Sequence, residues 1–452
     1  MILRNSLPGI KQFLQPIAAL TSLAILTRLI AAFVEHTGRM SASQAAGAIR
    51  TDACHRGNIV RYLARLGLSR DWSVLELLAD QLLEGEKRQG GNWIFIVDQT
   101  YCGQSGANTE NTFSRANFRP RAKKSNRKQK KVPKKSCHGF VMGLLITPSG
   151  IRIPSCRCYY TKEYAALKKW TYQTQIDLAA ELIRNAPIPS GVRVYVLGDT
   201  AFDAESIRKA CAERGFDWVV PTNPSRVLAG AANRPSVQSV AQGLQAGDFK
   251  AYELRPGHGE GRLHRRLSRF RLGRKAKSRT YYVHQEQRDV HSVGRVSLVF
   301  STKEKPIAGQ SVRVQKILMT NAKNLTAGEV VNLYDLRWQI ELFFKELKST
   351  LGFARYQFAS FAKVEGWTRV CLIAFVYLEW RRLRALSCRK LSASEKRFWQ
   401  YQRTYGGCQA VRQYAENHDL KKLDDWMKTP TGRRKLRQAL QRARPVEYRV
   451  CV

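Results

Sequence analysis

The chain has 452 residues and a formal net charge of +42, from 77 Lys and Arg against 35 Asp and Glu. Hydrophobic residues make up 44% of it, which excludes an intrinsically disordered chain and leaves room for about two or three folded domains. So large a positive charge predicts a polyanionic partner, most simply nucleic acid. Ribosomal or membrane-surface binding would also fit the charge, but the size of the chain and its candidate catalytic carboxylates favour it less.

The cysteines and the apolar segments bear on whether the protein has a structural zinc site or a membrane span. The ten cysteines form no repeated Cys-x2-Cys pair, so we do not expect a structural zinc site. Pro16–Val34 contains Arg28 and several hydroxyl side chains, and Val370–Leu378 is too short, so neither is expected to span a membrane. No secretory signal is visible, and a reducing cytoplasm is the expected location.

Helical patterns dominate residues 1–90. They run through Ile17–Glu35, Ala42–Ile49, Ile59–Leu66 and Asp71–Glu86. The middle of this region carries several basic residues, namely Arg50, His55, Arg56, Arg61 and Arg65. We expect a small helical DNA-binding domain here. The alternative is a helical bundle that only packs on the rest of the protein.

A short apolar strand follows and is expected to end at an acid, in the run Asn92-WIFIV-Asp98. A buried carboxylate without a partner is costly, so Asp98 needs either a metal ion or a local hydrogen bond. We favour a metal ligand, with a turn-capping aspartate at the strand end as the alternative.

Residues 115–135 contain eleven Lys and Arg and no acid, and they include Lys123, Lys124, Arg127 and Lys128. Such a block repels itself and does not fold alone. We expect a mobile loop that becomes ordered on DNA phosphates, each contact steepening the salt dependence of binding by about one unit. A solvated or localisation-type charge run is the alternative.

The next segments predict a hairpin and then a helix. His138–Thr147 and Ile151–Tyr160 have strand patterns and are joined by a Pro-Ser-Gly turn. A single helix is expected over Lys162–Asn185.

A second apolar strand, Val192–Gly198, is also followed by an acid, Asp199. Asp203 is expected to cap the following helix rather than to bind metal. Phe216–Val220 then predicts one more strand.

Residues 221–323 predict a β-rich segment. Its strand patterns lie at Phe249–Leu254, Leu267–Leu272, Thr280–His284 and Val296–Ser301. Residues 262–279 contain nine Lys and Arg and no acid, and Arg265 and Arg266 are among them. We expect these basic residues to lie on a sheet edge that faces DNA. The alternative is a β subdomain in which basic residues at the sheet edges prevent pairing with other chains.

One amphipathic helix is predicted from a capping box at Thr326 and Glu329 to beyond Lys348. At about 100° per residue, four polar side chains share an arc of roughly 60°. These are Tyr334, Arg337, Glu341 and Lys348. The apolar residues of the helix, Leu336, Ile340, Phe343, Phe344 and Leu347, form the core side, whereas Asp335, Gln339 and Glu346 are expected to point away. An ordinary surface helix with pairs such as Glu341 and Lys345 is the alternative.

The four polar residues have the spacing Tyr-x2-Arg-x3-Glu-x6-Lys, and Asp199-Thr-Ala-Phe fits the motif Asp-x-[Gly/Ala]-[Tyr/Phe]. With these residues the chain resembles the DDE transposases of bacterial insertion sequences, in the cut-and-paste group with the Tyr-Arg-Glu-Lys signature. The resemblance implies an α/β fold, a ribonuclease H-like mixed sheet interrupted by a β-rich insertion, with helical N- and C-terminal regions. It gives a DNA-binding domain at 1–90, a catalytic core at 91–220 and 324–388, an insertion domain at 221–323 and a basic helical region at 389–452.

The resemblance also implies the chemistry. Asp98, Asp199 and Glu341 would be the catalytic residues and hold two Mg²⁺ ions, with Asp98 bridging both and Mn²⁺ able to substitute. Two such ions about 3.5–4 Å apart activate the attacking oxygen and stabilise the leaving one. Tyr334, Arg337 and Lys348 would hold phosphates near the cleavage point.

The implied reaction is cleavage at terminal inverted repeats and joining of the 3′ ends to target DNA. A homodimer would carry it out in the nucleoid of a bacterial cytoplasm. The rivals are a ribonuclease H-like endonuclease without strand transfer and an inert DNA-binding protein. Residues 390–452 could dimerise, bind DNA or do both.

Some relatives cleave through a DNA hairpin and stack a flipped base on an aromatic side chain. The aromatics that could serve here are Tyr252, Phe270, Tyr281 and Tyr282.

Overall fold

The structure is a computed structural model that describes residues 7–21, 23–35, 56–69, 72–84, 86, 91–104, 108–116, 134–230, 234–254, 279–387 and 423–441. Several predictions fall outside these residues, including the helix at Ala42–Ile49, the strand at Leu267–Leu272, and Arg50, His55, Lys123, Lys124, Arg127, Lys128, Arg265, Arg266 and Phe270.

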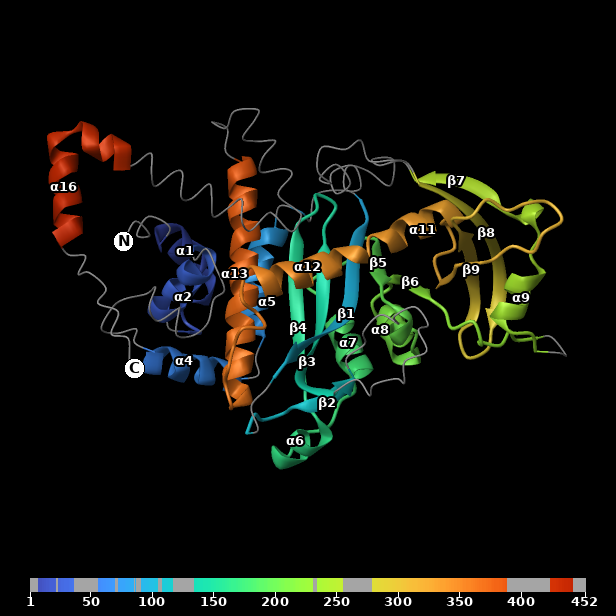
Figure 1. The fold of residues 1–452 in the computed structure, drawn as a ribbon, viewed down its shortest axis with the longest axis horizontal. Coiled ribbons are helices and arrows are strands. Elements are labelled where there is room, and N and C mark those ends of the chain that lie inside the picture. Colours follow the sequence, from blue (N-terminus) through green and yellow to red (C-terminus); the bar gives the residue numbers. More distant parts are fainter. Residues whose placement is uncertain are drawn as a thin grey trace, which may run out of the picture.

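A large mixed sheet forms the centre of the fold (Figure 1). Its strands follow the order β2-β3-β1-β5-β6-β10-β9-β8-β7, with β4 paired to β3. Their bounds are β1 Trp93–Gly103, β2 Phe113–Ala116, β3 Lys134–Ile146, β4 Arg152–Tyr159, β5 Val194–Leu197, β6 Asp217–Pro221, β7 Lys250–Leu254, β8 Arg279–Val290, β9 Gly294–Thr302 and β10 Lys316–Thr320. β5 runs parallel to both β1 and β6. With helices at both ends of the chain, this mixed α/β architecture confirms the predicted ribonuclease H-like fold class.

The helices of the described residues lie before, between and after these strands. They are α1 Leu7–Phe13, α2 Leu23–Glu35, α4 Arg56–Leu68, α5 Ser73–Leu83, α6 Lys162–Leu167, α7 Gln175–Arg184, α8 Glu205–Glu213, α9 Val237–Gly243, α11 Ala327–Asp335, α12 Trp338–Ser349, α13 Phe361–Ser387 and α16 Pro430–Gln441. None of these helices is long and apolar enough to cross a bilayer.

The predicted single helix over Lys162–Asn185 is wrong, because two helices, α6 and α7, occupy this range. Lys169 between them has a φ of 56°, which a helix does not allow. Trp170 packs on the ring of Tyr160 at 5.1 Å between centroids. A capping box of Thr174 and Asp177 then starts α7.

The long helix α13 lies between the N-terminal helices α1, α2 and α4 and the strand β4 (Figure 1). Val370, Leu372, Phe375 and Leu378 of α13 are all buried. On its other side α13 crosses α4 at two glycines, where a Cβ at Gly67 would lie 1.8 Å from Ala362 O and one at Gly366 would lie 2.0 Å from Leu63 O. The N-terminal helices are therefore packed tightly on the core.

The basic side chains of α4 face away from this contact, since Arg56, Arg61 and Arg65 are all exposed. DNA binding by the N-terminal region stays a prediction. The structure of α4 is compatible with both alternatives, a DNA-binding domain and a bundle that packs on the rest of the protein. One face of α4 packs on α13, and the other exposes arginines.

The β-rich segment continues the central sheet. β10 pairs with β6 of the core on one side and with β9 on the other. The helix α11 covers this part of the sheet, and the ring of Tyr252 packs so closely on Gly328 that a Cβ there would lie 2.2 Å from it. The insertion is thus joined to the core through paired strands as well as through α11.

Candidate active site

The parallel pairing of β1 and β5 places two of the predicted acids at one level of the sheet. Ile96 lies opposite Leu197, and two residues further along each chain come Asp98 and Asp199. β5 ends at Leu197, whereas β1 continues to Gly103 alongside β3. The expectation that the first strand ends at Asp98 is therefore wrong, because pairing with β3 carries the strand past it. Asp98 therefore lies just beyond the point at which β5 stops pairing with β1.

Asp199 lies at the start of a short 3-10 turn, Thr200–Phe202, where its side chain accepts a hydrogen bond from Ala201 N at 2.9 Å. The capping role expected for Asp203 is wrong, since Ala204 is the residue that precedes α8. Asp203 instead forms buried ion pairs with Arg208 at 2.8 Å and Arg226 at 2.6 Å. These pairs tie the turn that carries Asp199 to α8 and to the start of the insertion.

The helix predicted from Thr326 to beyond Lys348 is in fact two helices, α11 and α12, and its capping box at Thr326 and Glu329 is confirmed. The chain tightens between them, where the amides of Leu336 and Arg337 bond to carbonyls three residues back, at Leu333 and Tyr334. This single tighter turn leaves Arg337 at the start of α12.

The polar face of the two helices meets β1. Arg337 Nη1 lies 3.1 Å from Asp98 Oδ2, and its Nη2 lies 3.5 Å from Glu341 Oε1. About two turns after Glu341, Lys348 Nζ donates a hydrogen bond to Tyr101 O of β1 at 3.1 Å. The structure therefore brings Asp98, Arg337 and Glu341 into contact, from elements far apart in the sequence.

The electrostatics of Asp98 follow from its position. It is 6% exposed, and burial raises the pKa of its carboxyl to about 6, with further upward contributions from the charges of Asp199 and Glu341. The amide of Gln99 and the guanidinium of Arg337 act in the opposite direction. Burial also raises the pKa of Tyr334, beside Arg337, to about 12.

Within the described ranges no three His, Cys, Asp or Glu side chains are gathered closely enough to hold a metal ion. The guanidinium of Arg337 lies between the carboxylates of Asp98 and Glu341. The carboxylate oxygens of Asp98 and Glu341 are ligands of the kind that a hard divalent cation prefers, and they already surround the positive charge of Arg337. The charge of Asp199 also acts on Asp98, whose pKa it raises.

A pocket of about 330 Å³ lies next to Tyr334, between α11 and the strands β8, β9 and β10. Its lining includes the basic residues Arg279, Lys303 and Lys316 and the aromatic Tyr281. Lys316 Nζ lies 4.6 Å from the centre of the Tyr334 ring, and Lys303 Nζ lies 5.8 Å from that of Tyr281. Sequence reasoning did not find this pocket, because its walls come from three strands and a helix.

The expectation that Gln339 and Glu346 point to solvent is wrong, since both are buried. α13 and the start of β4 supply the partners on that side of α12, and Glu346 pairs there with Arg152 at 3.1 Å. A sequence signal of this pairing was Arg152 itself, a single charged residue in the apolar run Ile151-Arg-Ile-Pro, because a buried arginine needs an acidic partner. The predicted core residues of α12, from Ile340 to Leu347, are buried as expected.

Comparison with known protein families matches residues 168–377 to the family described as Transposase DDE domain. The matched range includes Asp199 and the residues from Tyr334 to Lys348, and it begins after Asp98 and β1. No curated protein matches the chain. The transposase resemblance is thus supported at the level of the DDE domain, and the Tyr-Arg-Glu-Lys group stays a prediction. The family matched by residues 168–377 consists of metal-dependent enzymes of DNA transposition.

Proposed function

We propose that this protein is a transposase that cleaves DNA at the terminal inverted repeats of an insertion sequence and joins the 3′ ends to target DNA. The observation that carries the proposal is the meeting of Asp98 and Glu341 around Arg337, at the level of the sheet where Asp199 follows β5. The match of residues 168–377 to a transposase DDE domain supports the same reaction class.

Asp98, Asp199 and Glu341 would hold divalent cations, for which we propose two Mg²⁺, with Mn²⁺ as a substitute. When bound, such ions activate the attacking oxygen and stabilise the leaving oxygen of a phosphodiester. The protein's own contribution is to hold three carboxylates at two neighbouring central strands and on a helix. Burial of Asp98 also limits the screening of its own charge by bulk water.

Arg337 links the carboxylates to DNA. A phosphate offers its guanidinium two oxygens in the planar arrangement that arginine prefers. When Arg337 turns to a DNA phosphate, it leaves Asp98 and Glu341, whose oxygens then become available to cations. DNA binding and metal binding would therefore strengthen one another.

The pocket beside Tyr334 extends this DNA site. Its lysines supply charge for phosphates, and Tyr281 and Tyr334 supply aromatic faces, where stacking of one base contributes about 1–3 kcal/mol. We propose that it takes a nucleotide next to the cleavage point and that Tyr281 is the aromatic among the four predicted candidates. Tyr252 is unsuited, because it packs under α11. The predicted DNA contacts of Lys123, Lys124, Arg127, Lys128, Arg265 and Arg266, and the homodimer, belong to the same proposal.

A plasmid carrying the flanking inverted repeats of the gene tests this function. Wild-type protein with Mg²⁺ should excise the element and join its ends to target DNA, and Asp98→Ala, Asp199→Ala and Glu341→Gln should abolish both products. Cleavage without joining would favour an endonuclease. DNA binding with no metal-dependent product would leave an inert binding protein.

A further inference from the structure

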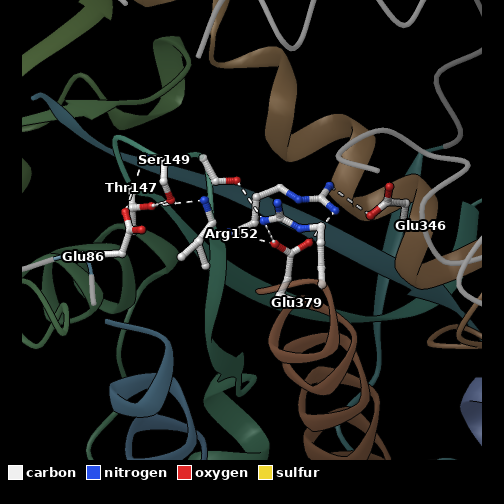
Figure 2. Close-up of polar contacts among 9 residues, drawn as sticks. Glu86, Thr147, Ser149, Arg152, Glu346 and Glu379 are labelled. Atoms are coloured by element: carbon white, nitrogen blue, oxygen red, sulfur yellow. Dashed lines mark hydrogen bonds and ion pairs between the residues drawn. The ribbon is translucent and has the colours of Figure 1, made fainter. Parts of the chain in front are cut away.

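A buried network of charged side chains joins three elements on the side of α12 that faces away from Asp98 (Figure 2). It consists of Arg152 at the start of β4, Glu346 of α12, and Glu379 and Arg382 of α13. The exposed fractions of these four side chains are between 0% and 4%. The two arginines face two glutamates, and burial raises the pKa of one of these, Glu346, to about 7.

Arg152 is the centre of this network. Its Nη1 lies 3.1 Å from Glu346 Oε2 and its Nη2 lies 3.0 Å from Glu379 Oε1, so one planar guanidinium binds a carboxylate from each helix. The guanidinium carbon also lies 5.0 Å from the centre of the Phe375 ring. Arg382 binds the other oxygen of Glu379 at 2.6 Å and donates to Gly150 O of the β3–β4 turn at 3.3 Å.

Stability alone does not account for this arrangement. Removing charges from water costs several kcal/mol per ion, and apolar side chains of similar size often give equal or greater stability at such places. Among the residues that the structure describes, Glu346 Oε1 has no hydrogen-bond partner. An ion pair, however, fixes distance and direction, whereas apolar side chains can slide past one another.

Glu346 shares α12 with two residues of the proposed site, five residues after Glu341 and two before Lys348. Because α12 is a single stretch of helix, its rotation and its position along its axis decide where the Glu341 carboxylate lies relative to Asp98. Arg152 holds one side of α12 by Glu346, and Lys348 contacts β1 on the other side at Tyr101 O.

We propose that Arg152 and Glu346 are positioning residues that hold α12 in the register at which Glu341 can share a cation with Asp98 and Asp199. This inference rests on the proposed function. Removal of the pair should lower the affinity of the site for metal, whereas the basic residues of the pocket beside Tyr334, which do not lie on α12, should keep their positions. Residues that orient metal ligands typically change metal affinity by about 10- to 100-fold when replaced.

Glu346→Met and Glu346→Gln test the proposal. Methionine fills the space without an acceptor for Arg152, whereas glutamine keeps an oxygen for it. Mn²⁺ binding to the protein in complex with its end DNA is measured by calorimetry, alongside DNA affinity and thermal unfolding. We expect about tenfold weaker Mn²⁺ binding for Glu346→Met, a smaller loss of DNA affinity because Lys348 shares α12, and recovery of both in Glu346→Gln.

Glu365→Met is the matched control, because Glu365 is also a buried glutamate, on α13, and contacts Tyr160 rather than α12. It should leave Mn²⁺ binding unchanged. Wild-type Mn²⁺ affinity in Glu346→Met, or an equal loss in the glutamine variant or the control, would overturn the positioning role alone. A wild-type complex that binds no Mn²⁺ would overturn the proposed function as well.

Discussion

The contact that Arg337 makes here and the contact proposed for it with DNA exclude one another. It bridges Asp98 and Glu341 here, and the same guanidinium is the group proposed to hold a DNA phosphate. The sequence spacing predicted that Arg337 and Glu341 share a helix face, since residues four apart are neighbours on a helix. It did not predict the contact with Asp98, because that distance depends on how α12 is placed over β1.

Arg337→Ala should therefore have opposite effects on the two ligands. Without the guanidinium, Asp98 and Glu341 lose a competing partner, so Mn²⁺ binding by the DNA-free protein should become roughly tenfold tighter, which corresponds to about 1.4 kcal/mol. Binding to end DNA should weaken. Lys209→Ala is the control, because Lys209 is an exposed cation that pairs with Glu205 and not with a proposed metal ligand. Unchanged Mn²⁺ affinity in Arg337→Ala would refute the competition.

At the scale of elements, sequence patterns predicted most strands and helices but not where two of the helices break. β1, β3, β4 and β5 were predicted from apolar runs and from the alternation of apolar and polar residues. These patterns depend only on neighbouring residues, so they could be recognised without knowledge of the tertiary structure. The break between α11 and α12 contains neither Gly nor Pro, and only tertiary packing reveals it. In the same way, the role of Asp203 depends on Arg226, which lies beyond β6.

Asp203→Ala tests the ion pairs that connect the turn carrying Asp199 to α8 and to the insertion. The aspartate is 3% exposed and pairs with two arginines that are 14% and 22% exposed, so we expect a loss of about 2–3 kcal/mol in the free energy of unfolding. Urea denaturation measures this. Glu205→Ala removes a solvent-exposed pair with Lys209 in the same region and should change little. Equal effects of the two substitutions would show that Asp203 has no structural role beyond a surface charge.

At the scale of the whole molecule, the N-terminal helices, the sheet and the insertion are joined by contacts between distant segments. The fold class was implied by the family resemblance of the sequence motifs. The continuity of the sheet through β10 and the close crossing of α4 and α13 did not follow, because both are set by partners far away in the chain.

Gly366→Ala tests the crossing of α4 and α13. An added Cβ would lie 2.0 Å from Leu63 O, so the two helices must separate, and we expect a loss of about 1–3 kcal/mol or more in stability. Gly243→Ala, with no atom within 4 Å of the added Cβ, is the control and should have a small effect. Thermal unfolding distinguishes them, and a stable Gly366→Ala protein would contradict tight packing of the N-terminal helices on the core.

The most direct test of the central claim replaces each proposed metal ligand by cysteine and measures the rate of end cleavage in Mg²⁺ and in Mn²⁺. A thiolate binds Mg²⁺ poorly and accepts softer ions more readily. Asp98→Cys, Asp199→Cys and Glu341→Cys should lose cleavage in Mg²⁺ and recover part of it in Mn²⁺, whereas Asp203→Cys should show no such metal-dependent rescue. Wild-type cleavage in Mg²⁺ by any of the first three variants would show that the replaced carboxylate is not a metal ligand.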